Sequence, residues 1–340
     1  MSKKNSNVPN LKKIVQSNKK ISSIYSVFKK SLKPMYKKKL VIAVSGGPDS
    51  LSLAALTKVL QFEKKMKVFF VLVDHSIRKN SKSEAIQVKK ILQQQKISLT
   101  ILTNKKEKII KNIQSTARKI RYKLLIDFSR KIQSNYILTA HHSDDQIETF
   151  LIRLSRGSGV QGLASMKFIT KLDKKISLVR PFLDFKKKDL VYVAKNTFNK
   201  IIKDPSNQDI KYLRTRIRYL KKIIEKNGID HDQIIKSIKN LASTNETLNA
   251  YIKKIFELNV KKKHNEIIIN HKKLLIESSE VQFKVLSAAI KNFSKSYYPP
   301  RSAKVQNIIN LLNKNKQKKF TLSGCLIVKT GNYLSIKKEA

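Results

Sequence analysis

The chain has 340 residues, of which 41% are hydrophobic and 28% are charged, and its net charge is +50. This length allows two domains, and no apolar run approaches the ~18 residues that a membrane span needs. The single cysteine, Cys325, excludes an internal disulfide and a cysteine-based metal site or iron–sulfur cluster. The charge suits a polyanion such as nucleic acid, although an AT-rich genome that favours lysine codons would produce the same excess.

The first 37 residues are predicted to form a basic, helical N-terminal extension. Apolar residues recur in it at helical spacing, at Ile21, Ile24, Tyr25, Phe28 and Leu32. The stretch lacks the apolar core of a secretory signal, and it lacks the arginines of a mitochondrial presequence because the first arginine is Arg78. We therefore expect a helix that packs on the following domain, in a cytoplasmic protein. A helix lying on a membrane surface is the alternative.

Residues 38–220 are predicted to form an α/β domain with a Rossmann-like parallel sheet. Short apolar runs alternate with helical patterns of ten or more residues, an order that favours parallel strands joined by crossover helices. The expected strands are 40–44, 68–73, 97–102, 136–139 and 176–179. The expected helices lie near 51–59, 84–94, 113–132 and 144–154, with a lysine-rich helix after Pro181.

The remainder is predicted to be a helical linker over 221–260 and a small α+β domain over 261–340. Few helix breakers occur up to about residue 258, whereas Tyr297, Tyr298, Pro299 and Pro300 interrupt the chain near its end. Two strand patterns, 320–328 and 333–336, flank the sequence Thr330-Gly331-Asn332, which is a hairpin signature.

The strongest local motif is SGGPDS at residues 45–50, between a strand and a helix. Two glycines allow a tight turn and a close approach to an anion. The N–H groups of the turn and of the helix start would then point at phosphate. No Gly-Lys-Ser/Thr follows, so this is not the Walker pattern. An ordinary glycine turn with Asp49 as a cap is the alternative.

Two further motifs lie at the predicted edge of the sheet or on a helix. Asp74 and His75 follow the second strand, and ligands of open parallel sheets bind beyond the carboxyl ends of strands. Arg118 and Arg121 are three residues apart, so a helix places both guanidinium groups on one face, where they suit phosphate. A strand-end acid with a surface histidine, and a solvated basic face, are the respective alternatives.

The richest motif is TAHHSDDQIET at residues 139–149, where a strand ends and a helix begins. An N-cap explains one acid, but it does not explain two histidines and three acids in a chain with only 23 acidic residues. Asp145 and Glu148 would share a helix face. They could hold the α-ammonium of an amino acid or a Mg²⁺ ion on ATP, and a zinc site is a further alternative.

A fifth motif combines a turn with a row of arginines. The turn is Asp-Pro-Ser-Asn at 204–207, and the arginines that follow are Arg214, Arg216 and Arg218. These arginines could be RNA contacts or the basic face of the linker helix.

Together these segments resemble the tRNA(Ile)-lysidine synthases, a family of N-type ATP pyrophosphatases with a PP-loop, in order and in spacing. The matching pieces are SGGPDS, VDHSIR, NIQSTARKIRY, LTAHHSDDQIETFLIRLSRGSGVQGLASM, RPFL and DPSNQDIKYLRTRIR, which span residues 40–218. The C-terminal FTLSGCLIV resembles the family's terminal domain more loosely. Two departures are the absence of tryptophan before the 204–207 turn, where Ile201 or Ile202 stands, and Ser76 in place of a glycine.

The resemblance implies a two-step reaction that uses ATP and Mg²⁺. The C2 carbonyl of cytidine 34 in the CAU anticodon of tRNA(Ile) is adenylated with release of pyrophosphate. The ε-amine of L-lysine then attacks C2 and expels AMP, so that the tRNA reads AUA as isoleucine. It also implies that the domain at 261–340 binds tRNA.

The resemblance further implies roles for individual residues. The residues expected to bind ATP are Ser45, Gly46, Gly47, Pro48, Asp49, Ser50, Asp74 and His75. The residues expected to contact lysine or tRNA are His141, Asp144, Asp145, Glu148, Arg121, Arg214, Arg216 and Arg218. Catalysis is assigned to Asp49, Asp145, Glu148 and Arg118. Asp49 is also the expected Mg²⁺ ligand, and we favour lysine as the ligand of Asp145 and Glu148.

Rival functions are distinguished by features that the sequence lacks. A tRNA 2-thiocytidine synthetase would need paired cysteines, and an amidotransferase would need a glutaminase domain for which no segment is a candidate. The remaining alternatives are another PP-loop tRNA-modifying enzyme and a non-catalytic tRNA-binding protein. No membrane partner is expected, and the sequence leaves the oligomeric state open, a homodimer included.

Overall fold

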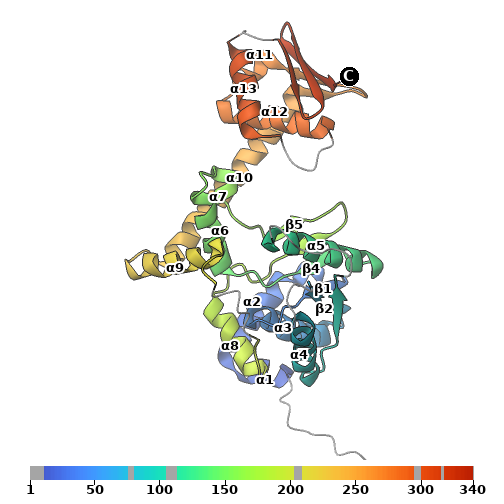
Figure 1. Ribbon diagram of the computed structural model, residues 1–340, viewed down its shortest axis with the longest axis vertical. Coiled ribbons are helices and arrows are strands. Elements are labelled where there is room, and N and C mark those ends of the chain that lie inside the picture. The colour runs from blue at the N-terminus through green and yellow to red at the C-terminus, as the bar shows by residue number, and fades with distance from the viewer. Residues whose placement is uncertain are drawn as a thin grey trace, which may run out of the picture. The chain divides into compact units, whose positions relative to one another are not determined.

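The computed structural model describes residues 11–75, 80–104, 113–202, 209–294, 300–314 and 318–339. The chain divides into an N-terminal unit, Met1–Asn240, and a C-terminal unit, Leu241–Ala340, and Figure 1 colours it from blue to red along the sequence. The division falls inside helix α10 (His231–Asn259), within the segment 221–260 that is expected to be a linker.

The N-terminal unit is built on one sheet, whose described strands follow the order β3-β2-β1-β4-β6-β5. The strands are β1 (Leu40–Ala43), β2 (Val68–Asp74), β3 (Leu99–Thr103), β4 (Tyr136–Leu138), β5 (Ile169–Lys171) and β6 (Ser177–Val179). All neighbouring pairs are parallel except β5 and β6. The strand order reverses beside β1, and ligands of open α/β sheets bind at such a switch point. The α/β class with a parallel sheet is therefore confirmed.

Helices cover both faces of this sheet because alternate strand residues point to opposite sides. Leu40 and Ile42 of β1 belong to one buried cluster, together with residues of α3, α4 and α8. Val41 belongs to a second cluster, which includes Leu125 of α5. The helices that follow the strands are α3 (Pro48–Lys64), α4 (Ser81–Gln94), α5 (Ile113–Lys131), α6 (Ser143–Leu154), α7 (Val160–Leu163), α8 (Lys187–Thr197) and α9 (Leu213–Lys226).

The N-terminal segment packs into the first of these clusters. It forms α1 (Leu11–Ser17), α2 (Lys19–Ser31) and a short 3₁₀ helix (Lys33–Met35). Phe28 is fully buried, and its ring centroid lies 5.5 Å from that of Phe182. The side-chain amide of Asn18 donates to the hydroxyl of Tyr192 on α8 at 3.0 Å. The packing expected from the helical spacing is therefore observed.

One strand of the sheet, β5, is not expected from the sequence. β5 is only three residues long, and two of the three are exposed. It pairs antiparallel with β6 at the edge of the sheet. A short, exposed run of this kind does not show the apolar pattern that reveals the buried strands.

The C-terminal unit contains an antiparallel sheet with the order β7-β8-β11-β10-β9. Its strands are β7 (Val260–Lys262), β8 (Ile267–Asn270), β9 (Lys319–Leu322), β10 (Cys325–Thr330) and β11 (Tyr333–Lys338). Its helices besides the end of α10 are α11 (His271–Leu274), α12 (Ser279–Ser294) and α13 (Ser302–Asn313). Thr330 pairs with Tyr333, so Gly331 and Asn332 form the two-residue hairpin loop that the sequence predicts. Cys325 is a buried free thiol.

Across the described residues, no helix is both long enough and apolar enough to cross a bilayer.

Candidate active site

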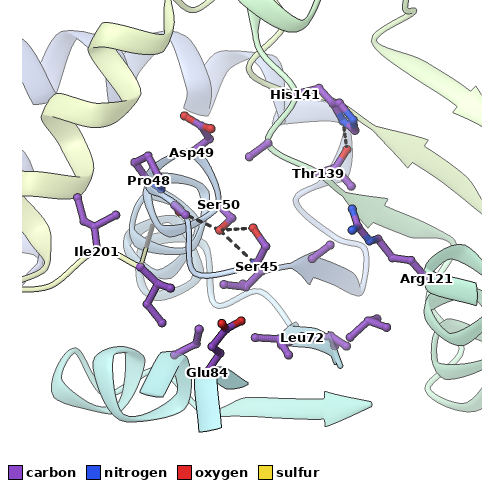
Figure 2. Close-up of a pocket in the computed structure, with 18 of the residues that line it drawn as sticks. Ser45, Pro48, Asp49, Ser50, Leu72, Glu84, Arg121, Thr139, His141 and Ile201 are labelled. Carbon is purple, nitrogen blue, oxygen red and sulfur yellow. Dashed lines mark hydrogen bonds between the residues drawn. The ribbon is translucent and has the colours of Figure 1, made fainter. Parts of the chain in front are cut away.

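A pocket of about 890 Å³ opens at the carboxyl ends of β1, β2 and β4. Its walls come from the segments that follow these strands, from α4 and α5, and from α8 and α9. Figure 2 shows Ser45, Asp49 and Ser50 on one side of this space, with Thr139 and His141 across from them. The switch point of the sheet therefore carries a cavity, as the topology predicts.

The 45–50 loop has a shape that requires glycine at one position. Gly46 has a φ of +87°, a region that side chains with a Cβ avoid. A Cβ built on Gly46 would lie 2.5 Å from Cγ2 of Val88 on α4, closer than any real contact. Pro48 starts α3, where its fixed φ suits the first helical position. The backbone of the loop therefore passes close to α4 and turns directly into the helix.

Ser50 holds this loop together through its hydroxyl. The backbone N–H groups of Ser45 and Gly46 each donate to Oγ of Ser50 at 3.1 Å, and this hydroxyl lies 3.0 Å from the carbonyl of Gly47, to which it can donate. The N–H groups of Ser45 and Gly46 are therefore already bonded, contrary to the expectation that the turn's N–H groups are free for phosphate. The N–H groups of Asp49 and Ser50 belong to the first turn of α3, which has no intrahelical acceptors for them.

Asp74 and His75 lie at the end of β2 and line the pocket. Asp74 is buried. Nε of Arg121 lies 3.4 Å from Nε2 of His75 and is placed to donate to it. Burial, together with the charge of Arg121, lowers the pKa of His75 to about 4. His75 is therefore neutral at physiological pH and can accept a hydrogen bond from a cation.

His142 lies at the centre of the acidic cluster. It is buried, and its Nε2 lies 3.6 Å from carboxylate oxygens of both Asp49 and Asp145, while its Nδ1 lies 3.6 Å from Asp144. Burial opposes protonation, but the carboxylates of Asp49, Asp145 and Asp144 outweigh it and raise the pKa of His142. The backbone N–H of His142 also donates to Asp145 at 3.1 Å, which caps α6. The imidazole of His142 thus lies between the 45–50 loop and the acids of α6.

Asp144 and Asp145 are neighbours with different surroundings. Asp144 forms an ion pair with Lys221 of α9 and accepts from the backbone N–H of Lys187 at 3.0 Å. Burial opposes ionisation of Asp144, but these two hydrogen bonds outweigh it and lower its pKa to about 2. Asp145 lines the pocket, and Asp144 does not. Asp145 is therefore the acid that a bound ligand can reach.

Glu148 is engaged by two arginines of α9. Its carboxylate, only 4% exposed, lies 2.6 Å from Nε of Arg218 and 3.2 Å from Nε of Arg214. Arg214 also approaches Asp145 at 4.0 Å, so Asp145 and Glu148 share a helix face as expected. Glu148 is not part of the pocket wall, whereas Arg214 and Arg218 are. The charge of Glu148 therefore acts on the pocket through these arginines.

His141 is a neutral side chain on the pocket wall. Its Nδ1 lies 2.8 Å from Oγ1 of Thr139, a hydrogen bond drawn in Figure 2. Burial lowers the pKa of His141 to about 3, and the nearby charges of Arg180, Arg118 and Arg214 add to this effect against the opposing charge of Asp145. His141 can therefore take part in hydrogen bonding at physiological pH without carrying charge.

The structure brings most of the predicted residues to one pocket. The predicted residues on its wall are Ser45, Gly47, Pro48, Asp49, Ser50, Asp74, His75, Arg118, Arg121, His141, Asp145, Arg214 and Arg218. Both arginines of the Arg118–Arg121 pair line it, as their spacing predicts. Gly46, Asp144, Glu148 and Arg216 are not on the wall, and Arg216 is exposed. Ser76, Ile77, Arg78, Asn112 and the turn at 204–207 lie outside the described residues.

Several residues of the site were not assigned a role from the sequence. The sequence shows His142 only as the second histidine of its motif, and Lys221 only as the first residue of the predicted helical linker. Arg180, within the RPFL segment, is buried and contacts the carbonyl of Lys167 at 2.7 Å. Glu84 of α4 lines the pocket opposite the 45–50 loop (Figure 2). The signals for these residues were the adjacency of the two histidines and, for Arg180, its place in the RPFL segment.

Few of the described side chains of the site are suited to bind a metal ion. Among the described residues, no group of three or more His, Cys, Asp or Glu side chains could hold a metal ion. The zinc alternative therefore finds no ligand set in this part of the chain. Oδ1 of Asp49 is buried and has no hydrogen-bond partner among the described residues. One free carboxylate oxygen fits a Mg²⁺ ion whose other ligands are phosphate oxygens and water.

Comparisons with known proteins show the family to which the chain is similar. The PP-loop domain family matches residues 19–226. The tRNA(Ile)-lysidine synthase of Wolbachia pipientis wMel is 35% identical over 317 residues, which cover 90% of this chain and 72% of the relative. That of Orientia tsutsugamushi (strain Boryong) is 33% identical, also over 317 residues, which cover 88% of this chain and 70% of the relative.

Among solved structures, a U34-tRNA thiolase from Methanococcus maripaludis superposes with a TM-score of 0.56 at 20% identity, covering 66% of this chain and 80% of that chain. This likeness shows a shared fold. The sequence similarity to the first relative covers most of both chains, and the range matched by the PP-loop domain family contains the 45–50 loop and the acidic motif of α6. The chain therefore belongs to the PP-loop superfamily and, within it, to the tRNA(Ile)-lysidine synthases.

Proposed function

We propose that the chain uses ATP to join L-lysine to C2 of cytidine 34 in the CAU anticodon of tRNA(Ile). The observation that carries this proposal is that the 45–50 loop lies next to the acids of α6 at one pocket. These acids, Asp144, Asp145 and Glu148, are called the acidic wall below. His142 lies 3.6 Å from both Asp49, at the start of α3, and Asp145, on α6. A nucleotide on the loop and an amine on the acids would therefore meet in the same space.

In the first step the C2 carbonyl oxygen attacks the α-phosphorus of ATP, and pyrophosphate leaves. The first-turn N–H groups of Asp49 and Ser50 would bind the departing phosphates. Arg118 and Arg121 line the pocket and would neutralise charge on the phosphates or on the RNA. Mg²⁺ bound to the phosphates and to Asp49 would supply further charge stabilisation. Asp74 and His75 would border the adenosine.

In the second step the ε-amine of lysine attacks C2, and AMP leaves with its bonding electrons. Asp145 would bind the α-ammonium of lysine, since its carboxylate lies on the pocket wall. Glu148 would contribute by holding Arg214 and Arg218 in place, where they can contact the lysine carboxylate or the RNA. His141 would orient the substrate as a neutral hydrogen-bonding group, and Asp144 would fix α6 against α9. Holding both reactants in one geometry supplies much of the rate enhancement.

The tRNA partner would bind chiefly through charge. The chain has a net charge of +50. Its affinity for RNA should therefore fall steeply as the salt concentration rises, because phosphate contacts release counterions. Cytidine 34 would have to leave the anticodon stack to enter the pocket, as is usual for single-stranded RNA recognition. The C-terminal unit would add contacts to the tRNA body, and Arg216 would add a contact to the RNA. The cytoplasmic location expected from the sequence is part of this proposal.

The deciding experiment is ATP-dependent incorporation of labelled lysine into a tRNA(Ile) transcript with a CAU anticodon. A matched transcript with uridine in place of cytidine 34 serves as the control. We expect incorporation into the first transcript alone, together with release of AMP and pyrophosphate. Tight binding of the transcript without incorporation would instead support a non-catalytic tRNA-binding protein. Modification of the cytidine without lysine would indicate another PP-loop tRNA-modifying enzyme.

A further inference from the structure

Helix α9 has two chemically distinct faces. Its inner face supplies Arg214 and Arg218 to the pocket wall and Lys221 to Asp144, and Figure 1 shows the helix beside α6. Its outer face carries exposed basic side chains around an exposed tyrosine. We define the α9 outer face by Arg216, Tyr219, Lys222 and Lys226.

Tyr219 is unusually open for an aromatic side chain on an anchored helix. It is 66% exposed, and the Nζ of Lys222 lies 5.9 Å from the centroid of its ring. Leu220 and Ile223 beside it are 43% and 53% exposed. An open aromatic ring flanked by cations is the arrangement on which nucleic-acid bases stack while their phosphates are neutralised.

The positive charge on the α9 outer face favours a polyanion over a second copy of the chain as its partner. Glu225 is the one acid in the 14 residues of α9, and it pairs with Lys221 at 3.4 Å. The outer face therefore presents positive charge to its surroundings. A second copy of the chain would bring its own +50 charge to this surface and be repelled. A polyanion complements it.

The position of the face points to single-stranded RNA near the reacting nucleotide. Tyr219 follows Arg218 directly, so it lies about 1.5 Å further along the helix axis than a residue of the pocket wall. If one nucleotide of an RNA strand lies in the pocket, the neighbouring nucleotides of that RNA strand would lie beside α9. Unpaired loop nucleotides can splay out and stack on aromatic side chains.

We propose that the α9 outer face is a docking surface for single-stranded RNA of the anticodon loop, in which Tyr219 stacks on a base next to the one that enters the pocket. Arg216, Lys222 and Lys226 bind the adjoining phosphates. The proposal rests on the proposed function, because it takes tRNA as the substrate and places one of its nucleotides in the pocket. It assigns to this face a share of RNA affinity that is separate from chemistry in the pocket.

The first test compares the dissociation constants of the tRNA(Ile) transcript for the wild type and Tyr219→Ala, measured by fluorescence anisotropy without ATP or lysine. We expect about a tenfold loss of affinity in Tyr219→Ala, the usual effect of removing one base-stacking ring. Tyr219→Phe keeps the ring and should bind within about twofold of the wild type. The KM for ATP should not change in either variant.

A matched control exists on α3. Phe62 is 60% exposed, and Nζ of Lys58 lies 4.6 Å from its ring centroid, so the pair has the same chemistry as Tyr219 and Lys222. It lies 14 residues after Pro48, about 21 Å along the helix from the 45–50 loop. Phe62→Ala should therefore leave RNA affinity unchanged.

A second test asks whether Arg216 and Lys222 contact phosphates of the RNA. The double variant Arg216→Gln/Lys222→Gln should bind the transcript more weakly, and the slope of log affinity against log salt should become shallower by about 1 to 2. Loss of affinity with an unchanged slope would show that these side chains do not contact phosphate.

The outcomes separate this proposal from the proposed function. Normal transcript binding without lysine incorporation contradicts the function alone. An unchanged dissociation constant in Tyr219→Ala, with the wild type binding normally, overturns the docking surface alone. No RNA binding by the wild type overturns both. If sedimentation shows a dimer that Tyr219→Ala disrupts while RNA affinity is unchanged, the face belongs to a second copy and the proposal is wrong.

Discussion

The 45–50 loop and the acids of α6 face the same pocket, but they are held in place differently. The loop depends on neighbours in sequence, since Ser50 bonds the backbone of Ser45 and Gly46. The acids depend on α9, where Arg218 and Lys221 lie 70 and 77 residues beyond their partners Glu148 and Asp144. The loop is therefore defined by backbone shape, and the acidic wall is defined by charge balance. Damage to the first should remove activity, and damage to the second should also lower stability.

The largest effect is expected from Gly46→Ala. The added methyl group would meet Val88 at 2.5 Å in a backbone conformation that alanine rarely adopts, so the loop must shift. A shift of about 1 Å at a reacting centre can cost about 100-fold in rate. We expect a loss of that size in lysine incorporation. Gly228→Ala is the matched control, because Gly228 has a φ of +89° but open space around it. Equal activity in the two variants would show that the loop shape is not required.

The charge balance of the acidic wall is tested by Arg218→Ala. Removing this arginine leaves the buried carboxylate of Glu148 with Arg214 alone. We expect the free energy of unfolding to fall by about 2–3 kcal/mol, which lowers the melting temperature by about 4–12 °C in a unit of this size. Adding Glu148→Gln to this variant should restore part of the loss. The exposed Arg216→Ala on the same helix should not change stability, and equal losses in both single variants would refute the buried pair.

A smaller effect, dependent on pH, is expected from Lys221→Met. The pKa of Asp144 is lowered to about 2, so the ionised form is favoured in the folded state. Its contribution, about 2 kcal/mol, is complete above the ordinary pKa near 4 and is lost as the pH falls toward 2. Denaturant unfolding should therefore show a gap between wild type and variant at pH 7 that narrows between pH 4 and pH 3. A gap that is constant over this range would mean that the ion pair is not its source.

The same contrast explains what the sequence could predict. The glycines, proline and serine of the 45–50 loop are consecutive, so its turn and its place before α3 could be predicted. The parallel sheet could be predicted because β1, β2 and β4 are apolar runs between long helical patterns. β5 could not, because its three residues are largely exposed and take part in the sheet only by pairing with β6.

The acidic wall could be predicted only in part. Spacing placed Asp145 and Glu148 on one face of a helix, but no local rule distinguishes Asp144 from Asp145. That distinction depends on Lys221 and the N–H of Lys187, which come from distant segments. The central position of His142 likewise depends on Asp49, an acid from the other half of the pocket.

The most direct test of the account is Asp145→Asn, assayed for its two half-reactions separately. The variant keeps the volume of the side chain and removes the charge proposed to bind lysine. We expect near-normal pyrophosphate release with ATP and tRNA, and a KM for lysine raised about tenfold or more. Asp127→Asn, an exposed acid on α5, should behave as the wild type. Unchanged affinity for lysine, or loss of pyrophosphate release together with lysine transfer, would contradict the division of the pocket into a nucleotide loop and a lysine-binding wall.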